Sequence, residues 1–148
     1  MIVSAASSIT LLVYNFQLFI DMNQGTPVKK FGQPTKRYVQ IPDITNDAEL
    51  IRKYCHCHSH EVFWPEIQEG QKQVGILEME IYRKDNHLVM IVETVADFDW
   101  DKAMAKLATL PRQAEWEAFV AAYQGCDPNA KSDEKWQMTE RMFHHYEW

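Results

Sequence analysis

Two consecutive stretches of the sequence decide the fold: Gly75–Arg83 (GILEMEIYR) and Leu88–Val92 (LVMIV), with Asp85 and Asn86 between them. The first stretch alternates, as a strand does when its two faces meet different surroundings. Its predicted faces are Leu77, Met79 and Ile81 on one side and Ile76, Glu78, Glu80 and Tyr82 on the other. The second stretch is an unbroken apolar run, which is typical of an interior strand. Because Asp-Asn favours a turn, the two stretches are predicted to form an antiparallel hairpin.

A strand and a helix are predicted before this hairpin. Arg37–Ile41 alternates and is followed by Pro42, which predicts a short strand. Asn46 is followed three residues later by Glu49, a spacing that resembles a capping box at the start of a helix. Apolar side chains then recur at helical spacing, at Leu50, Ile51, Tyr54 and Cys57 or His58. Trp64–Ile67 (WPEI) interrupts or restarts the helix, because proline fits only in a first turn.

Two helices and a last strand are predicted after the hairpin. Asp99 begins one helix and Pro111 begins another, which Gly125 and Pro128 close. Trp136–His144 (WQMTERMFH) alternates and predicts the last strand. This order is typical of an α+β fold, the ferredoxin-like split βαβ unit, with helices on one face of an antiparallel sheet. The other face is then predicted to be a ligand floor, a packing surface for a second subunit, or both.

The composition is that of a globular domain that binds neither nucleic acid nor a membrane. The chain has 148 residues, of which 46% are apolar and 12% aromatic, so it has room for one hydrophobic core. Lys and Arg number 15 and Asp and Glu number 21, a net charge of −6, whereas phosphate affinity requires clustered cations. Cys55, Cys57 and Cys126 form an odd and sparse set, which favours reduced thiols in the cytoplasm.

Residues 1–35 differ from the rest and are predicted to be an N-terminal extension or linker. Ile9–Ile20 is apolar but 12 residues long, whereas a membrane span needs about 20. A secretory signal carries Lys or Arg before its apolar stretch, whereas none precedes Ile9 here. Met22 is a candidate for the functional start; the alternative is a short interfacial helix or a degenerate signal. The domain itself is predicted to span residues 36–148.

Tyr54 and His58 are the first candidates for chemistry. They lie four residues apart, so on a helix they share a face and can reach one pocket. Imidazole titrates near neutral pH and a phenol donates or accepts hydrogen bonds, so the pair suits proton transfer to and from sugar oxygens. The alternative is a core tyrosine beside a histidine that ends the helix. Tyr54–His60 (YCHCHSH) also raises a zinc site, but no second ligand pair completes a tetrahedron, so no metal is expected.

Aromatic and acidic side chains supply further candidates. Five tryptophans are many for a chain of this size, and indole rings stack on the apolar faces of sugars. Trp64 and Trp116 are therefore candidate substrate contacts, with core packing as the alternative for each. Glu78 and Glu80 lie in the first hairpin strand and would accept hydrogen bonds from hydroxyl groups if they faced a cavity. The alternative is that both are exposed strand carboxylates.

Several short motifs follow one another between Lys36 and His144. They are His58-Ser59, Trp64–Ile67, Gly75–Tyr82, Glu93-Thr94, Phe98-Asp99, Pro111–Glu117, Glu134–Trp136 and Glu140-Arg141. Each motif alone is weak, but in this order they resemble the L-rhamnose mutarotase family. The resemblance implies a ferredoxin-like unit that pairs sheet to sheet with a second copy as a dimeric α/β barrel. It also implies interconversion of the α and β anomers of L-rhamnose, L-fucose or another deoxy sugar, without cofactor or metal.

The resemblance implies roles for individual residues. The family's proton donor is a histidine four residues after a substrate-contacting tyrosine, which matches His58 and Tyr54. Short members place this histidine four residues before the Trp-Pro-Glu motif, which selects His60 instead. The two spacings agree on His58 if this chain has two extra residues in the loop before Trp64. His58 is therefore preferred and His60 is the second choice. Trp116 would form a stacking wall.

Two positions depart from the family's pattern. Glu115 stands where the family has the first member of an aromatic pair, and Met79 stands where it has a tyrosine. These departures leave the preferred sugar more open than the reaction. The group that takes the anomeric proton is also open, with Glu78 and Glu80 as candidates. A non-catalytic ligand-binding or dimerisation module of the same barrel fold is the alternative function, and a haem or oxygenase-like barrel is a third.

Overall fold

The hairpin that the sequence predicts is the centre of the sheet. A computed structural model of the chain describes residues 24–125 and 132–146. In it, β2 (Ile76–Lys84) pairs antiparallel with β3 (His87–Val95). Asp85 adopts a positive φ of 54° in the turn between them, a conformation that Asp tolerates better than most residues. The predicted hairpin is therefore confirmed.

Two further strands complete the sheet. β1 (Thr35–Ile41) pairs antiparallel with β3, and β4 (Gln137–Met138) pairs antiparallel with β1. The resulting order, β2-β3-β1-β4, is that of a ferredoxin-like sheet. The α+β fold class is confirmed, and the strand order brings β1 to the centre of the sheet beside β3.

A β-bulge changes which side chains of β2 face the helices. Ile76 pairs with Thr94, whereas Glu78 already pairs with Glu93, so Leu77 is an extra residue without a partner on β3. Ile76 is therefore buried on the same face as Met79, although the predicted alternation placed them on opposite faces. Simple alternation is wrong here because one inserted residue shifts every side chain before it to the other face.

The last strand is much shorter than predicted. Of the predicted strand Trp136–His144, only Gln137 and Met138 pair with β1. Thr139 still donates from its backbone N–H to the carbonyl of Val39, but the chain then leaves the sheet, and Met142 is 90% exposed. An alternating pattern assigns the faces of a strand, but a strand also requires a partner for its backbone hydrogen bonds.

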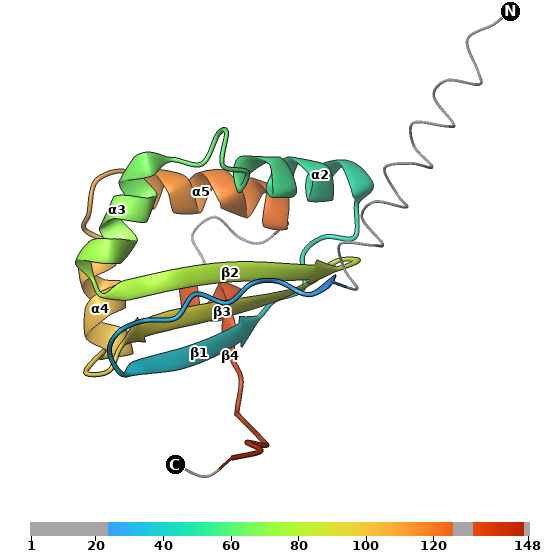
Figure 1. Ribbon diagram of the computed structural model, residues 1–148. Helices are drawn as coiled ribbons and strands as arrows, with labels where there is room; N and C mark the ends of the chain where they lie inside the picture. The colour runs from blue at the N-terminus through green and yellow to red at the C-terminus, as the bar shows by residue number, and fades with distance from the viewer. Residues whose placement is uncertain (1–23, 126–131, 147–148) are drawn as a thin grey trace, which may run out of the picture. The chain divides into compact units, whose positions relative to one another are not determined.

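Helices precede and follow the hairpin. α2 (Ala48–Cys57) and α3 (Pro65–Gln73) lie before it along the chain. α4 (Trp100–Leu107), α5 (Gln113–Gln124) and the short α6 (Ser132–Lys135) lie after it. Figure 1 shows α2, α3 and α5 as a layer on one face of the sheet, and within residues 33–125 and 132–146 no helix covers the other face. This is the predicted arrangement of layers.

The helix ends agree with the sequence in part. Asp99 caps α4 by accepting from the backbone N–H of Lys102 at 3.1 Å, as expected. The cap of α2 is Asp47, which accepts from two backbone N–H groups, so the predicted capping box at Asn46 is displaced by one residue. α5 begins after Arg112 rather than at Pro111. Gly125 ends α5 at φ 72°. Any other residue would clash there, because its Cβ would lie 1.6 Å from the hydroxyl oxygen of Thr45.

The core lies between the helix layer and one face of the sheet. Along β3, Leu88, Met90, Val92 and Thr94 face the helices and are buried. The residues between them face the uncovered side, where Val89 is 37% exposed. The apolar run of β3 is therefore covered on one face within this chain, and the expectation of an interior strand applies to that face alone.

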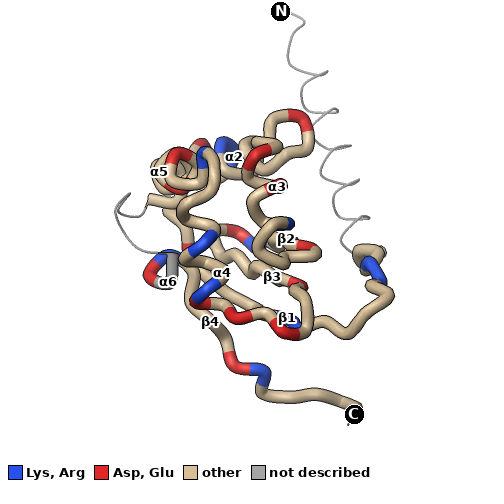
Figure 2. Tube along the Cα trace, turned by 90° about the vertical axis from the view of Figure 1, so that its left-hand side faces the viewer, with Lys and Arg blue, Asp and Glu red and all other residues tan. Residues whose placement is uncertain are grey.

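Figure 2 shows basic residues interspersed with acidic ones over the described chain.

The N-terminal residues form a separate unit of contacts. The chain divides between Gly32 and Gln33, and within residues 24–32 the Lys29 ammonium lies 5.4 Å from the centre of the Phe31 ring. Ile9–Ile20 and Met22 lie outside the described residues, so what the sequence predicts for residues 1–23 stays a prediction. Among the described residues, no helix combines the length and apolarity needed to cross a membrane.

Candidate functional site

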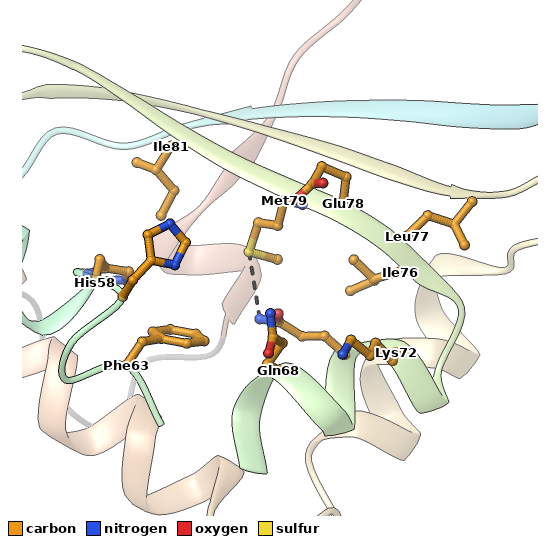
Figure 3. A pocket seen from close by; sticks show the side chains of 11 residues that line it. His58, Phe63, Gln68, Lys72, Ile76, Leu77, Glu78, Met79 and Ile81 are labelled. Atoms are coloured by element: carbon orange, nitrogen blue, oxygen red, sulfur yellow. Dashed lines mark hydrogen bonds between the residues drawn. The ribbon is translucent and has the colours of Figure 1, made fainter. Parts of the chain in front are cut away.

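A cavity lies between the helix layer and the covered face of the sheet. Its inner part, of about 90 Å³, is lined by residues of α2, α4, α5 and three strands of the sheet. Its outer part, of about 290 Å³, lies between α3 and β2. The two parts share the walls formed by His58, Phe63, Gln71, Ile76, Met79 and Ile81. Shared walls make them the inside and the mouth of one site, and Figure 3 shows the mouth.

His58 ends α2 and is partly buried at the junction of the two parts. Its Nδ1 lies 2.8 Å from the backbone carbonyl oxygen of Tyr54. A carbonyl oxygen only accepts hydrogen bonds, so Nδ1 carries a hydrogen and the neutral imidazole keeps its Nε2 lone pair free. Burial lowers the pKa of His58 below its ordinary value. The imidazole is therefore a neutral proton acceptor at pH 7.

Tyr54 lies one turn before His58 on the same face of α2. Its ring centre is 4.4 Å from that of His58, and its side chain is 3% exposed. Burial raises the pKa of the phenol well above its ordinary value, so the hydroxyl keeps its proton. Gln124 Nε2 donates to this hydroxyl oxygen at 3.5 Å. Tyr54 is therefore a hydrogen-bond donor within the cavity rather than a base.

The thiol of Cys57 contacts both His58 and the carbonyl that His58 binds at the end of α2. Its Sγ donates to the Tyr54 carbonyl at 3.0 Å and lies 3.3 Å from His58 Nδ1. Burial raises the pKa of this thiol to about 12, so it stays protonated at neutral pH. The thiol and the imidazole thus share one carbonyl oxygen, which limits how the His58 ring can turn.

Aromatic rings form the wall opposite the sheet. Trp116 of α5 packs edge-on against His58 with ring centres 5.3 Å apart and against Phe63 with centres 5.0 Å apart. It is 6% exposed and lines the inner cavity. The structure thus brings together Tyr54, His58 and Trp116, three of the residues that the sequence singles out.

The other predicted site residues lie farther out. His60 and Glu78 border the mouth, where His60 is exposed and Glu78 accepts from the backbone N–H of Met79 at 3.2 Å. The register places Glu80 on the uncovered face of the sheet, where it accepts from the Tyr82 hydroxyl at 3.3 Å. It lines neither part of the cavity.

Trp64 also lies outside both parts of the cavity. It precedes α3 and stacks on Phe119 of α5 with ring centres 5.4 Å apart. The guanidinium carbon of Arg112 lies 3.9 Å from the centre of its ring, an arrangement suited to a cation–π contact. Trp64 therefore braces the helix layer and supports Trp116 from behind, with ring centres 5.3 Å apart.

Five polar residues of the inner cavity are absent from the sequence-based prediction. They are Gln40 of β1, Gln71 of α3, and Gln113, Glu117 and Gln124 of α5. Gln113 Nε2 donates to Glu117 at 3.0 Å, and the buried Lys135 ammonium lies 3.9 Å from the same carboxylate. A polar residue at a covered position of a strand, as at Gln40, is the one signal that the sequence offered.

The site combines complementary groups around a small space. A neutral imidazole can accept a proton, a protonated phenol can donate a hydrogen bond, and amide and carboxylate oxygens can accept hydrogen bonds. Within residues 24–125 and 132–146, no group of three His, Cys, Asp or Glu side chains could hold a metal ion. The arrangement can take a proton from one oxygen of a small bound molecule and return it to another.

Comparisons with known proteins match most of the chain to one family model and to two proteins. Residues 37–145 match the family model described as L-rhamnose mutarotase. An L-fucose mutarotase of Xanthomonas campestris pv. campestris is 34% identical over 108 residues, which cover 73% of this chain and 86% of that protein. A UPF0734 protein of Dictyostelium discoideum is 36% identical over 90 residues, 60% of this chain and 70% of that protein. The matched region holds every residue of the cavity.

Proposed function

Because the chain belongs to the L-rhamnose mutarotase family, we propose that it interconverts the α and β anomers of L-rhamnose or of a related deoxy sugar such as L-fucose. The observation that carries this proposal is the neutral imidazole of His58 beside the protonated phenol of Tyr54 in a cavity walled by Trp116. The enzyme is then an isomerase that acts on a carbohydrate and needs no cofactor.

The proposed reaction opens and closes the sugar ring. Opening breaks the bond between the anomeric carbon and the ring oxygen, while the anomeric hydroxyl loses its proton and becomes an aldehyde. His58 Nε2 takes this proton, and the ring oxygen receives a proton as it leaves. Rotation of the aldehyde followed by the reverse transfers gives the other anomer, so no net proton is gained or lost.

One imidazole can serve both oxygens. The anomeric and ring oxygens are bonded to the same carbon, so a protonated His58 needs only a small shift to pass the proton from one to the other. Tyr54 then donates a hydrogen bond to the ring oxygen without ionising, as its raised pKa requires. The sequence assigned His58 as the acid; its lowered pKa favours a cycle in which it first accepts and then donates.

The candidates for a separate carboxylate base differ in part from those that the sequence suggested. Glu78 borders the mouth of the cavity, whereas Glu80 lies on the other face of the sheet. Glu117 lines the inner cavity and is held by Gln113 and Lys135. If a second group exchanges protons with the sugar, Glu117 is a candidate because it lines the inner cavity together with His58, whereas Glu80 lines neither part.

Saturation-transfer NMR of anomer exchange tests the proposal directly. We expect the protein to accelerate exchange of L-rhamnose or L-fucose above the rate in buffer, with the two sugars compared side by side. Exchange at the buffer rate for a panel of deoxy sugars would reject the enzyme. Binding of a sugar without faster exchange would favour a non-catalytic binding module of the same fold.

We also propose that the uncovered face of the sheet packs against a second copy in the cytoplasm. This face carries apolar side chains that one chain leaves partly exposed, namely Ile41, Tyr82 and Val89. A charge among them, Val89→Asp, is expected to give the mass of a single chain in analytical ultracentrifugation where the parent chain gives twice that mass. Ala105→Asp, on an exposed helix position, is the control and keeps the mass of the parent.

A further inference from the structure

We propose that Gln40 and Gln113 read the hydroxyl groups of the sugar, each accepting a hydrogen bond from one hydroxyl through its side-chain oxygen. This inference rests on the proposed function and adds to it the residues that select the substrate. Both side chains line the inner cavity with Tyr54 and His58, and they reach it from opposite layers, the sheet and the helices.

The hydrogen bonding of Gln40 fixes which end of its side-chain amide is the nitrogen and which is the oxygen. Gln40 lies on the covered face of β1 and is 3% exposed. Its Nε2 donates to the backbone carbonyl of Trp136 at 3.3 Å, and a carbonyl cannot donate in return, so the nitrogen must lie on that side. The oxygen is thereby left without a hydrogen-bond partner among the described residues.

The amide of Gln113 is fixed in the same way. This residue opens α5 and is 6% exposed. Its Nε2 donates to a carboxylate oxygen of Glu117 at 3.0 Å, which again only accepts. Its oxygen is likewise buried and has no partner among residues 24–125 and 132–146. Two glutamines from different elements thus present the same unused group at one cavity.

A buried acceptor without a donor lowers the stability of the folded chain. The amide nitrogens have structural partners in the Trp136 carbonyl and the Glu117 carboxylate, but neither of these contacts explains the two buried oxygens that have none. A ligand that brings donors into the cavity does explain them, because binding then satisfies both oxygens. This is the usual relation between a binding site and the stability of its protein.

The chemistry of the wall selects a neutral ligand with hydroxyl groups. Two acceptor oxygens and the Glu117 carboxylate disfavour an anionic group such as phosphate. Lys135 lies beside Glu117 and offsets its charge, so the cavity wall does not favour a cationic ligand either. The part of the strand wall formed by β2 and β3 is apolar, with Met79, Ile81 and Met90. A molecule with hydroxyl groups on one edge and an apolar group on another, such as a deoxy sugar, fits both walls.

The test pairs protein variants with sugar variants. Gln40→Met and Gln113→Met keep the length of the side chain and remove the acceptor, and Gln73→Met on the exposed end of α3 is the control. Dissociation constants for L-fucose and L-rhamnose are measured by NMR titration, and KM by anomer exchange. We expect each cavity variant to weaken binding about 3- to 10-fold, the loss for one neutral hydrogen bond, and the control to bind as the parent does.

Monodeoxy analogues of the preferred sugar make the test specific. Removal of the hydroxyl that Gln113 reads should weaken binding to the parent chain by a similar factor. That analogue should bind Gln113→Met as well as the full sugar does, because the contact is already lost, whereas analogues altered elsewhere should still lose affinity. The same holds for Gln40 with a different hydroxyl. A merely structural role of either glutamine would weaken all analogues equally.

The outcomes separate this inference from the proposed function. If the parent chain accelerates exchange but both variants keep its affinities, or lose affinity equally for all analogues, the hydroxyl-reading role is wrong and the mutarotase stands. If the parent chain binds without accelerating exchange, the cycle still decides the role of the glutamines. If a variant does not fold, the analogue series on the parent chain decides instead: two hydroxyl positions should matter for affinity. An equal effect of every position would overturn the proposal.

Discussion

The two faces of the sheet carry similar apolar residues but have different surroundings. On β3, Leu88 and Val92 face the helices and are 2% and 0% exposed, whereas their neighbour Val89 on the other face is 37% exposed. The covered face is completed by the chain's own helices and contains the cavity. The uncovered face has no such layer, and its apolar side chains are those of a surface that another layer would cover.

The faces also differ in what their polar groups do. On the covered side, Tyr54, His58 and Gln40 are buried or partly buried around a cavity. On the uncovered side, Arg37 of β1 pairs with Glu93 of β3 across the sheet, and Glu80 accepts from Tyr82. Polar groups on the covered face are thus available to a ligand, whereas those on the uncovered face pair with each other.

Removal of His58 tests whether the chemistry belongs to the covered face, and it should have the largest effect. His58→Ala is expected to reduce anomer exchange by about 10²–10⁴-fold, because it removes the group that accepts and returns the proton. His60→Ala is the control, since His60 lies exposed at the mouth. Saturation-transfer NMR measures both. Loss of exchange in His60→Ala with none in His58→Ala would assign the proton transfer to the outer histidine.

Neighbouring truncations on β3 compare the packing of the two faces. Leu88→Ala removes a fully buried side chain and is expected to lower the free energy of unfolding by about 2–5 kcal/mol. Val89→Ala should cost less than about 1 kcal/mol where the chain is monomeric. Urea unfolding measures both. A loss for Val89→Ala that grows with protein concentration would show that a second copy covers the face, and equal losses at all concentrations would contradict the difference between the faces.

The hairpin and the pairing of Tyr54 with His58 could be predicted because both follow from local spacing. Alternation and a turn specify two neighbouring strands, and a separation of four residues on a helix specifies a shared face. The bulge at Leu77 could not be predicted, since one inserted residue leaves the pattern of residue types almost unchanged. The short β4 could not be predicted either, because its length depends on how far β1 offers a partner.

The polar wall of the cavity could not be predicted, for a different reason. The sequence offers one signal, a polar residue at a covered strand position at Gln40, and none at Gln113 at the start of a helix. Only the packing shows that both are buried, that their amide nitrogens have partners and that their oxygens do not. Glu80 and Trp64 show the converse: their residue types suit a sugar site, but neither lines the cavity in the structure.

The acid dependence of the protein should report the burial of His58. Its folded-state pKa lies below 6.5, the ordinary value that applies to the unfolded chain. Below pH 6.5 the unfolded chain therefore binds more protons, so this contribution to stability is complete above pH 6.5 and is lost as the pH falls through the folded-state pKa. Unfolding free energies between pH 4 and 8 should show this loss in the parent chain and not in His58→Gln.

Catalysis should follow the same titration. The acid limb of kcat/KM, after subtraction of the rate in buffer, is expected to have its midpoint below pH 6.5, because a protonated imidazole cannot accept the anomeric proton. Tyr54 contributes no alkaline limb near neutral pH, since its raised pKa keeps it protonated. An acid limb with its midpoint above pH 6.5 would mean that His58 is not the group that titrates in the reaction.

The smallest effect is expected from the ion pair on the uncovered face. Arg37→Gln removes the partner of Glu93, and the two side chains are 55% and 13% exposed. An exposed pair contributes about 0.2–1 kcal/mol, and the loss should shrink in 1 M salt, where the Debye length is about 3 Å. Lys53→Gln, which breaks the exposed pair with Glu49 on α2, is the matched control. If a second copy buries the uncovered face, however, Arg37→Gln leaves a buried carboxylate unpaired and costs about 3–5 kcal/mol, while the control keeps its small effect. The ratio of the two losses therefore reports whether the face is covered in solution.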